Sequence, residues 1–102
     1  MQKLLINIGE SGMNKVRILV VDDEEKIANL IANFLTKEGF QVFTAGSGSK
    51  ALELFQLKNP DLVVLDLMMP DMSGYDVCKK ICSLSKTPII MLTAKTDEVD
   101  KL

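Results

Sequence analysis

The sequence predicts an α/β protein built on a parallel β-sheet, because apolar strand-like runs alternate along the chain with amphipathic helical segments. Three runs are apolar, with Arg17 the one exception, and rich in β-branched residues, as strands covered on both faces are; they span residues 16–21, 62–65 and 89–92. Alternation of strands and helices with short connections predicts parallel strands joined by right-handed crossovers.

A fourth, weaker strand is expected at residues 41–45, where polar and apolar residues alternate as they do in an edge strand. The first helix is expected at residues 24–38, and Gly39 is placed to end it. Five apolar residues of this helix share one stripe at helical spacing and are expected to face the core: Ile27, Leu30, Ile31, Phe34 and Leu35.

Two further helices are expected at residues 48–57 and 74–82. Ser47 and Ser73 directly precede them, and serine is a favoured N-cap residue. The Asn59-Pro60 pair marks the end of the first of these helices. The residues expected to face the core are Ala51, Leu52, Phe55, Val77, Cys78 and Ile81.

Composition is ordinary for a single small domain of 102 residues, with 47% hydrophobic and 25% charged residues. The net charge of −2 gives no basic footprint for nucleic acid, so no direct DNA contact by this chain is expected. No apolar run approaches the roughly 20 residues of a membrane span, and residues 1–12 lack the long apolar stretch of a secretory signal. These features predict a cytoplasmic protein with no membrane contact.

Cys78 and Cys82 are four residues apart, on one face of a predicted helix, where a disulfide fits poorly. Their spacing is not one that zinc sites use, and the chain contains no histidine. Two reduced thiols without a chemical role are therefore expected.

Polar residues interrupt the apolar pattern at the carboxyl ends of the predicted strands. Asp22 and Asp23 close the first strand, Asp66 the third and Thr93 the fourth. Ligands of open α/β sheets bind in the crevice beyond these ends. Clustered carboxylates without histidine or thiolate suit a hard cation such as Mg²⁺, and a carboxylate beside that ion is a nucleophile of the aspartyl-phosphate kind. Taken singly, an aspartate at a strand end is usually a turn or helix-cap residue, and a threonine there usually packs or caps.

Three segments together resemble the receiver domain of two-component response regulators: ILVVDDE at residues 18–24, LVVLDLMMPDMSG at 62–74 and PIIMLTA at 88–94. The resemblance covers residues 15–102. This part of the sequence is similar to receivers attached to winged-helix DNA-binding domains, which implies that the parent protein is a transcriptional regulator. It also implies a flavodoxin-like, doubly wound parallel sheet with strand order 2-1-3-4. Residues 1–14 are then an N-terminal extension or tag.

The resemblance implies Mg²⁺-dependent phosphorylation of Asp66 by a histidine kinase. Asp23 would be a direct ligand of Mg²⁺ or Mn²⁺, Asp22 would hold the ion mainly through water, and Asp66 and the backbone carbonyl of Met68 would complete the protein's share. By the same resemblance, Thr93 would contact a phosphoryl oxygen and act as a switch.

Further residues of the expected pocket also follow from the resemblance. Ala94 and Lys95 would lie near the phosphoryl group, and Pro70 and Gly74 would shape the loop after the phosphoacceptor strand. The family pattern continues past residue 102, so we expect a receiver domain that is incomplete at its C-terminus. Its fourth helix would begin near residue 97, and its fifth strand, with a lysine for the phosphate, and fifth helix would be missing.

Two alternatives remain open from the sequence. The chain could be a non-phosphorylatable interaction fragment, because the expected lysine is missing. A Mg²⁺-dependent hydrolase working through an aspartyl-phosphate would carry a second acid two residues after the nucleophile, where this chain has Met68. We expect no enzyme activity beyond self-phosphorylation and self-dephosphorylation. We also expect the edge of the fourth strand to be exposed, and a homodimer or the strand-like residues 3–8 to cover it.

Overall fold

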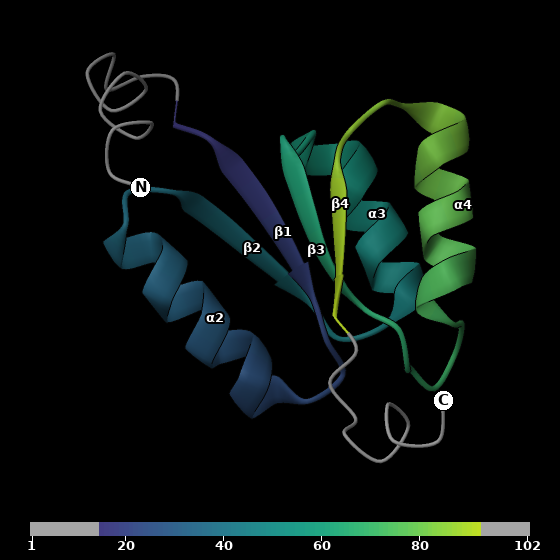
Figure 1. Ribbon diagram of the computed structural model, residues 1–102, viewed down its shortest axis with the longest axis horizontal. Helices are drawn as coiled ribbons and strands as arrows, with labels where there is room; N and C mark the ends of the chain where they lie inside the picture. Colours follow the sequence, from purple (N-terminus) through teal and green to yellow (C-terminus); the bar gives the residue numbers. More distant parts are fainter. Residues whose placement is uncertain (1–14, 93–102) are drawn as a thin grey trace.

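A computed structural model describes residues 15–92 of the chain. Its core is a parallel sheet with strand order β2-β1-β3-β4 (Figure 1). The strands are β1 (Arg17–Val21), β2 (Gln41–Ala45), β3 (Leu62–Asp66) and β4 (Ile89–Leu92). The predicted fold class, the strand order and the edge position of β2 are therefore confirmed.

Three helices connect the strands and cover both faces of the sheet. They are α2 (Glu25–Lys37), α3 (Gly48–Lys58) and α4 (Gly74–Leu84). In Figure 1, α2 lies on one face, and α3 and α4 lie side by side on the other. This is the doubly wound arrangement that the alternating sequence predicted.

The helix boundaries follow the local signals in the sequence. The side chain of Ser47 accepts a hydrogen bond from the Lys50 amide at the start of α3, and that of Ser73 accepts one from the Asp76 amide at the start of α4. After α2 the chain turns at Gly39, whose φ of 100° lies in the region that favours glycine. Both predicted N-caps and the predicted glycine stop are confirmed.

The apolar core has two parts, one on each face of the sheet. On the side of α3 and α4, nine buried residues form one cluster: Leu19, Val21, Ala45, Ala51, Phe55, Val63, Leu65, Val77 and Ile81. On the side of α2 the buried cluster is smaller and consists of Ile18, Val20, Ala28 and Val64. The alternation of neighbouring strand residues between the two clusters is the two-residue period of a sheet covered on both faces.

The prediction of which α2 residues face the core was partly wrong. Leu30 is 69% exposed and Phe34 is 60% exposed, whereas Ala28 is buried and packs with Ile31 and Leu35 against the sheet. Leu30 lies about 200° around the helix from Ala28, since the helix has 3.6 residues per turn. Within residues 15–92, α2 is the only helix on its face, so no second helix covers its flank.

Two smaller features of the fold concern the cysteines and the character of the helices. Both cysteines are free thiols, and their sulfur atoms lie 4.0 Å apart on one face of α4. Burial is the main cause that raises the pKa of Cys78. Among residues 15–92 no helix combines the length and apolar character needed to cross a bilayer.

Candidate functional site

The carboxylates of the site are placed by the ends of two central strands. Asp66 is the last residue of β3, and Asp22 follows β1 directly, its amide donating a 3.0 Å hydrogen bond to the carbonyl oxygen of Ala45 in β2. Val21 lies opposite Leu65 in the pairing of β1 with β3. Because the two strands are parallel and in this register, the next residues, Asp22 and Asp66, leave the sheet beside one another.

Three carboxylates meet at this edge. The ligand oxygens of Asp22, Asp23 and Asp66 all lie within 4.8 Å of one another. Asp22 is 3% exposed and Asp66 4% exposed, whereas Asp23 is exposed. Two of the three negative charges are thus removed from water, an arrangement that is costly unless a positive charge or hydrogen-bond donors compensate it.

Local backbone hydrogen bonds orient the two buried carboxylates. The Glu24 amide donates to Oδ1 of Asp22 at 2.9 Å, and the Met68 amide lies 3.4 Å from Oδ1 of Asp66. Among the described residues, the atoms of this cluster that could bind a metal are all carboxylate oxygens, which fits a hard divalent cation such as Mg²⁺ better than a soft metal.

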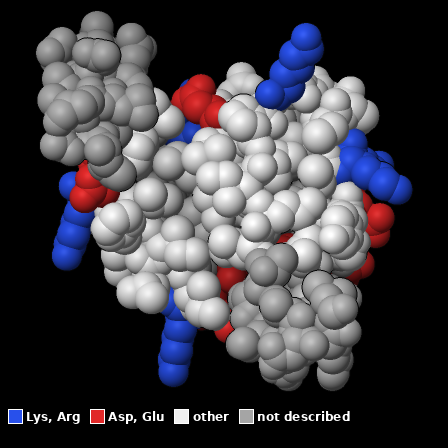
Figure 2. All heavy atoms as spheres, in the orientation of Figure 1, with Lys and Arg blue, Asp and Glu red and all other residues white. Residues whose placement is uncertain are grey.

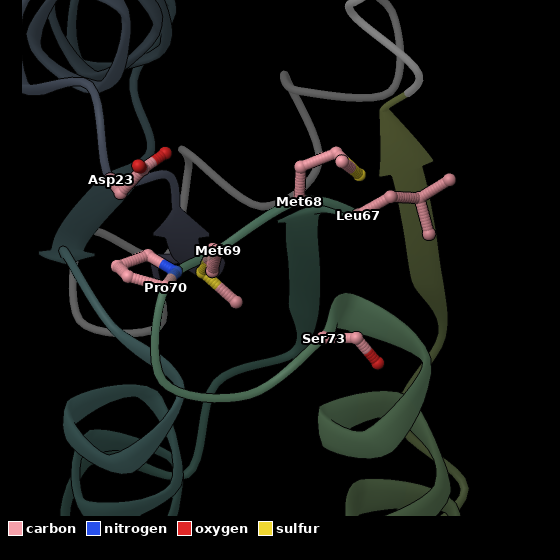
Figure 3. A pocket seen from close by; sticks show the side chains of 6 residues that line it. All are labelled: Asp23, Leu67, Met68, Met69, Pro70 and Ser73. Carbon is pink, nitrogen blue, oxygen red and sulfur yellow. The ribbon is translucent and has the colours of Figure 1, made fainter. Parts of the chain in front are cut away.

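A pocket opens beside the carboxylates, with a volume of about 500 Å³. Its lining comes from Asp23 and from the loop between β3 and α4, and comprises Asp23, Leu67, Met68, Met69, Pro70 and Ser73 (Figure 3). Met68 and Met69 point to opposite sides of this loop in Figure 3. Met69 packs on the core, while Met68 is 48% exposed at the mouth of the pocket. An external group can therefore approach Asp23, the exposed member of the cluster, from this side.

Gly74 brings the start of α4 close to Asp66. Its amide donates a 2.8 Å hydrogen bond to the carbonyl oxygen of Leu67, which closes the loop. A Cβ at residue 74 would overlap the backbone carbonyl oxygen of Asp66, so only glycine fits without a shift. The role of Gly74 in shaping the loop, expected from the resemblance alone, has this physical cause.

Three residues of the expected site, Thr93, Ala94 and Lys95, lie outside the described residues. The described part ends at Leu92, which pairs with Asp66 in the register of β3 and β4. The Leu67 amide continues this ladder with a 3.3 Å bond to the carbonyl oxygen of Leu92. The segment that precedes Thr93 thus reaches the level of Asp66.

Asp71 was not among the residues singled out in the sequence. Its carboxylate accepts hydrogen bonds from the backbone amides of Gly48 and Ser49 and from the Ser49 hydroxyl, at 2.8, 3.1 and 2.8 Å. These bonds, led by the one from Gly48, lower the pKa of Asp71 from 3.8 to about 2. No local sequence pattern predicts these hydrogen bonds, because their donors lie 22 and 23 residues away from Asp71.

The sequence matches the family of response regulator receiver domains over residues 18–102. Two curated relatives are a probable transcriptional regulator, ycf27, of Cyanophora paradoxa and the DNA-binding response regulator MtrA of Mycolicibacterium smegmatis. The first is 49% identical over 88% of this chain and 38% of its own length, and the second 51% identical over 82% and 37%. The chain thus spans less than two fifths of the length of these relatives.

Solved structures agree with this likeness. The chemotaxis protein CheY4 of Vibrio cholerae superposes with a TM-score of 0.77 at 33% identity, over 85% of this chain and 75% of its own. The response regulator TrrA of Thermotoga maritima, solved in complex with Mg²⁺ and BeF, gives a TM-score of 0.69 at 31% identity over 84% and 94%. On the match of residues 18–102 and these identities, the chain belongs to the receiver domain family of two-component response regulators.

Proposed function

We propose that Asp66 is the phosphoacceptor of this receiver domain and takes a phosphoryl group from a phosphohistidine of a histidine kinase. In the transfer the P–N bond to the imidazole breaks, a P–O bond forms to one carboxylate oxygen of Asp66, and the released imidazole nitrogen takes up a proton. The observation that carries the proposal is the meeting of three carboxylates within 4.8 Å at the sheet edge, beside an open pocket.

The residues that would hold the metal ion are Asp22, Asp23, Asp66 and the backbone carbonyl of Met68. A bound Mg²⁺ or Mn²⁺ supplies positive charge for the carboxylates and for the phosphoryl oxygens. The chain itself orients the acceptor. Asp66 is fixed by the last register pair of β3 with β4, and the Glu24 amide holds Asp22 in place.

Thr93 would donate a hydrogen bond to a phosphoryl oxygen and would act as a switch that responds to phosphorylation. Ala94 and Lys95 would lie near the phosphoryl group. Support comes from the chain path, since Leu92, directly before Thr93, pairs with Asp66. We assign residues 15–102 to the receiver unit and residues 1–14 to an extension or tag. In this assignment the chain is a cytoplasmic signalling module, whose chemistry is limited to its own phosphorylation and dephosphorylation.

The parent protein would be a transcriptional regulator, with DNA contacted by a separate winged-helix domain and not by this chain. The names of the relatives support this: ycf27 is described as a probable transcriptional regulator and MtrA as DNA-binding. Phosphorylation adds charge and acceptor oxygens at the sheet edge, which can bias a neighbouring element between two arrangements.

The test is incubation of the 102-residue chain with Mg²⁺ and acetyl phosphate, followed by intact-mass measurement. We expect a mass increase of one phosphoryl group that disappears in Asp66→Asn and on removal of Mg²⁺. Asp61→Asn is the matched control. Asp61 directly precedes β3, at the end of the strand away from Asp66, where its carboxylate accepts a hydrogen bond from the Arg17 amide. Phosphorylation that persists in Asp66→Asn would disprove the assignment. A response from a longer chain only would favour the interaction-fragment alternative.

We also propose a homodimer through the edge of β4. Within residues 15–92 this strand pairs with β3 alone, and Ile90 is 51% exposed on it. Figure 2 shows that the centre of the face over β4 carries few charges, while lysine and arginine side chains project from its rim. Light scattering during size-exclusion chromatography should give a dimer for the wild type and a monomer for Ile90→Lys. A wild-type monomer at high concentration would refute this.

A further inference from the structure

Asp71 joins two segments that the sequence separates widely. It lies in the loop of residues 67–73, which runs from β3 to α4 and carries the Met68 carbonyl. Its carboxylate accepts three hydrogen bonds at the start of α3, from the amides of Gly48 and Ser49 and from the hydroxyl of Ser49. The first-turn amides of a helix have no partner within the helix, and the helix dipole favours a negative charge there.

The contact does more than cap a helix. Ser47 already accepts a bond from the Lys50 amide as the local cap of α3. Water or a neighbouring side chain could satisfy the amides of Gly48 and Ser49 as well. What Asp71 adds is a link across 22 and 23 residues, between the middle of the loop and a helix that packs on the central sheet.

Two further contacts fix the loop on either side of Asp71. Met72 packs on the core and lies so close to Gly48 that a Cβ at residue 48 would overlap it. The bond from the Gly74 amide to the Leu67 carbonyl closes the base of the loop at 2.8 Å. Between these contacts, the Met68 amide lies 3.4 Å from Oδ1 of Asp66, the longest of these distances.

We propose that Asp71 is a positioning residue for the metal site, which holds the loop against α3 so that the backbone carbonyl of Met68 stays aligned with the carboxylate cluster. This inference rests on the proposed function, since it concerns the same metal. It assigns Asp71 no contact with the ion or the phosphoryl group. Outer groups that hold a ligand in place typically contribute 10–100-fold to metal affinity.

The test uses the 102-residue chain with Asp71→Asn, and Asp76→Asn as the matched control. Asp71→Asn replaces one of the two accepting oxygens by an amide nitrogen and so weakens the link. Asp76 is also exposed and lies three residues beyond the loop, in the first turn of α4, so its change removes the same charge and leaves the link intact. We expect Asp71→Asn to raise the Kd for Mg²⁺ about 10-fold, and Asp76→Asn to leave it near the wild-type value. At saturating Mg²⁺ the final extent of phosphorylation by acetyl phosphate should recover, because the chemistry of Asp66 is intact.

A second readout needs no metal. In EDTA, the amides of Gly48 and Gly74 should exchange with solvent faster in Asp71→Asn than in wild type and Asp76→Asn. If Asp71→Asn does not fold, Ser49→Ala removes one of the three bonds and should give a smaller shift of the Mg²⁺ Kd in the same direction.

The outcomes separate the two proposals. A wild-type chain that binds no Mg²⁺ and takes no phosphoryl group overturns the proposed function together with this role. A wild-type chain that binds Mg²⁺, with equal Kd values in Asp71→Asn and Asp76→Asn, overturns the positioning role alone. A loss of stability in Asp71→Asn without a change in Kd does the same, because it shows a merely structural contact.

Discussion

Gly74 lies so close to Asp66 that a Cβ at residue 74 would overlap the backbone carbonyl oxygen of Asp66 and stand 2.7 Å from the Cα of Leu67. The start of α4 is therefore pressed against the end of the strand that carries the proposed phosphoacceptor. Both atoms belong to the backbone, so neither can move aside as a flexible side chain would. The spacing of helix and strand at this point depends on the missing side chain.

Gly74→Ala should destabilise the domain, because either the loop or the end of β3 must shift. We expect a loss of about 1–3 kcal/mol in the free energy of unfolding, the range for overpacked sites. Urea unfolding followed by circular dichroism measures it. Gly46→Ala is the control, since a Cβ at residue 46 meets nothing within 4 Å. Equal losses in the two variants would contradict this explanation.

Asp22→Asn should separate the charge of the cluster from its hydrogen bonds. Asparagine keeps an oxygen for the Glu24 amide but removes one of three charges within 4.8 Å. In EDTA the variant should be more stable than wild type, by on the order of 1–3 kcal/mol for like charges at this separation.

Addition of Mg²⁺ should shift the stability difference in favour of the wild type. Mg²⁺ at about 100 times its Kd should add about 2.7 kcal/mol to the wild type by mass action, and much less to Asp22→Asn. Urea unfolding with and without Mg²⁺ measures both effects. A variant that is less stable in EDTA and gains as much from Mg²⁺ as wild type would argue against a cation site.

The strand ends were predictable because their signals are local. Apolar runs that stop at an aspartate define where β1 and β3 end, and parallel strands bring their carboxyl ends to one edge. The N-caps at Ser47 and Ser73 are likewise local, because each serine accepts a hydrogen bond from an amide three residues further along the chain. This part of the fold and the meeting of Asp22 with Asp66 therefore followed from the sequence.

The remaining features depend on contacts between distant segments. Helical periodicity showed that Leu30 and Phe34 lie on an apolar side of α2, but it cannot say how far a neighbouring surface extends over that side. The three bonds of Asp71 depend on how the loop after β3 meets the start of α3, a relation that no local pattern encodes.

The link made by Asp71 should be sensitive to acid. Its pKa in the folded chain is about 2, lowered from 3.8 chiefly by the bond from the Gly48 amide. A carboxyl whose pKa is depressed by folding adds stability above pH 3.8, and this contribution disappears as the pH falls towards about 2. The stability difference between wild type and Asp71→Asn should therefore shrink over that window. Urea midpoints at a series of pH values measure it, and a difference that stays constant would contradict the prediction.

The exposed side of α2 provides the last prediction. Phe34 is 60% exposed, whereas Ile81 is fully buried on the other face of the sheet. Phe34→Ala should change the free energy of unfolding by no more than about 0.5 kcal/mol, as surface changes do. Ile81→Ala should cost about 2–5 kcal/mol, because it leaves a cavity in the core.

Urea unfolding of both variants at several protein concentrations checks this contrast. The concentration series matters because a second copy on this face would make the cost of Phe34→Ala rise with concentration. A cost for Phe34→Ala that equals the cost for Ile81→Ala at every concentration would contradict the exposed position of Phe34. A small and constant cost would leave Phe34 as the solvent-exposed side chain that the fold presents.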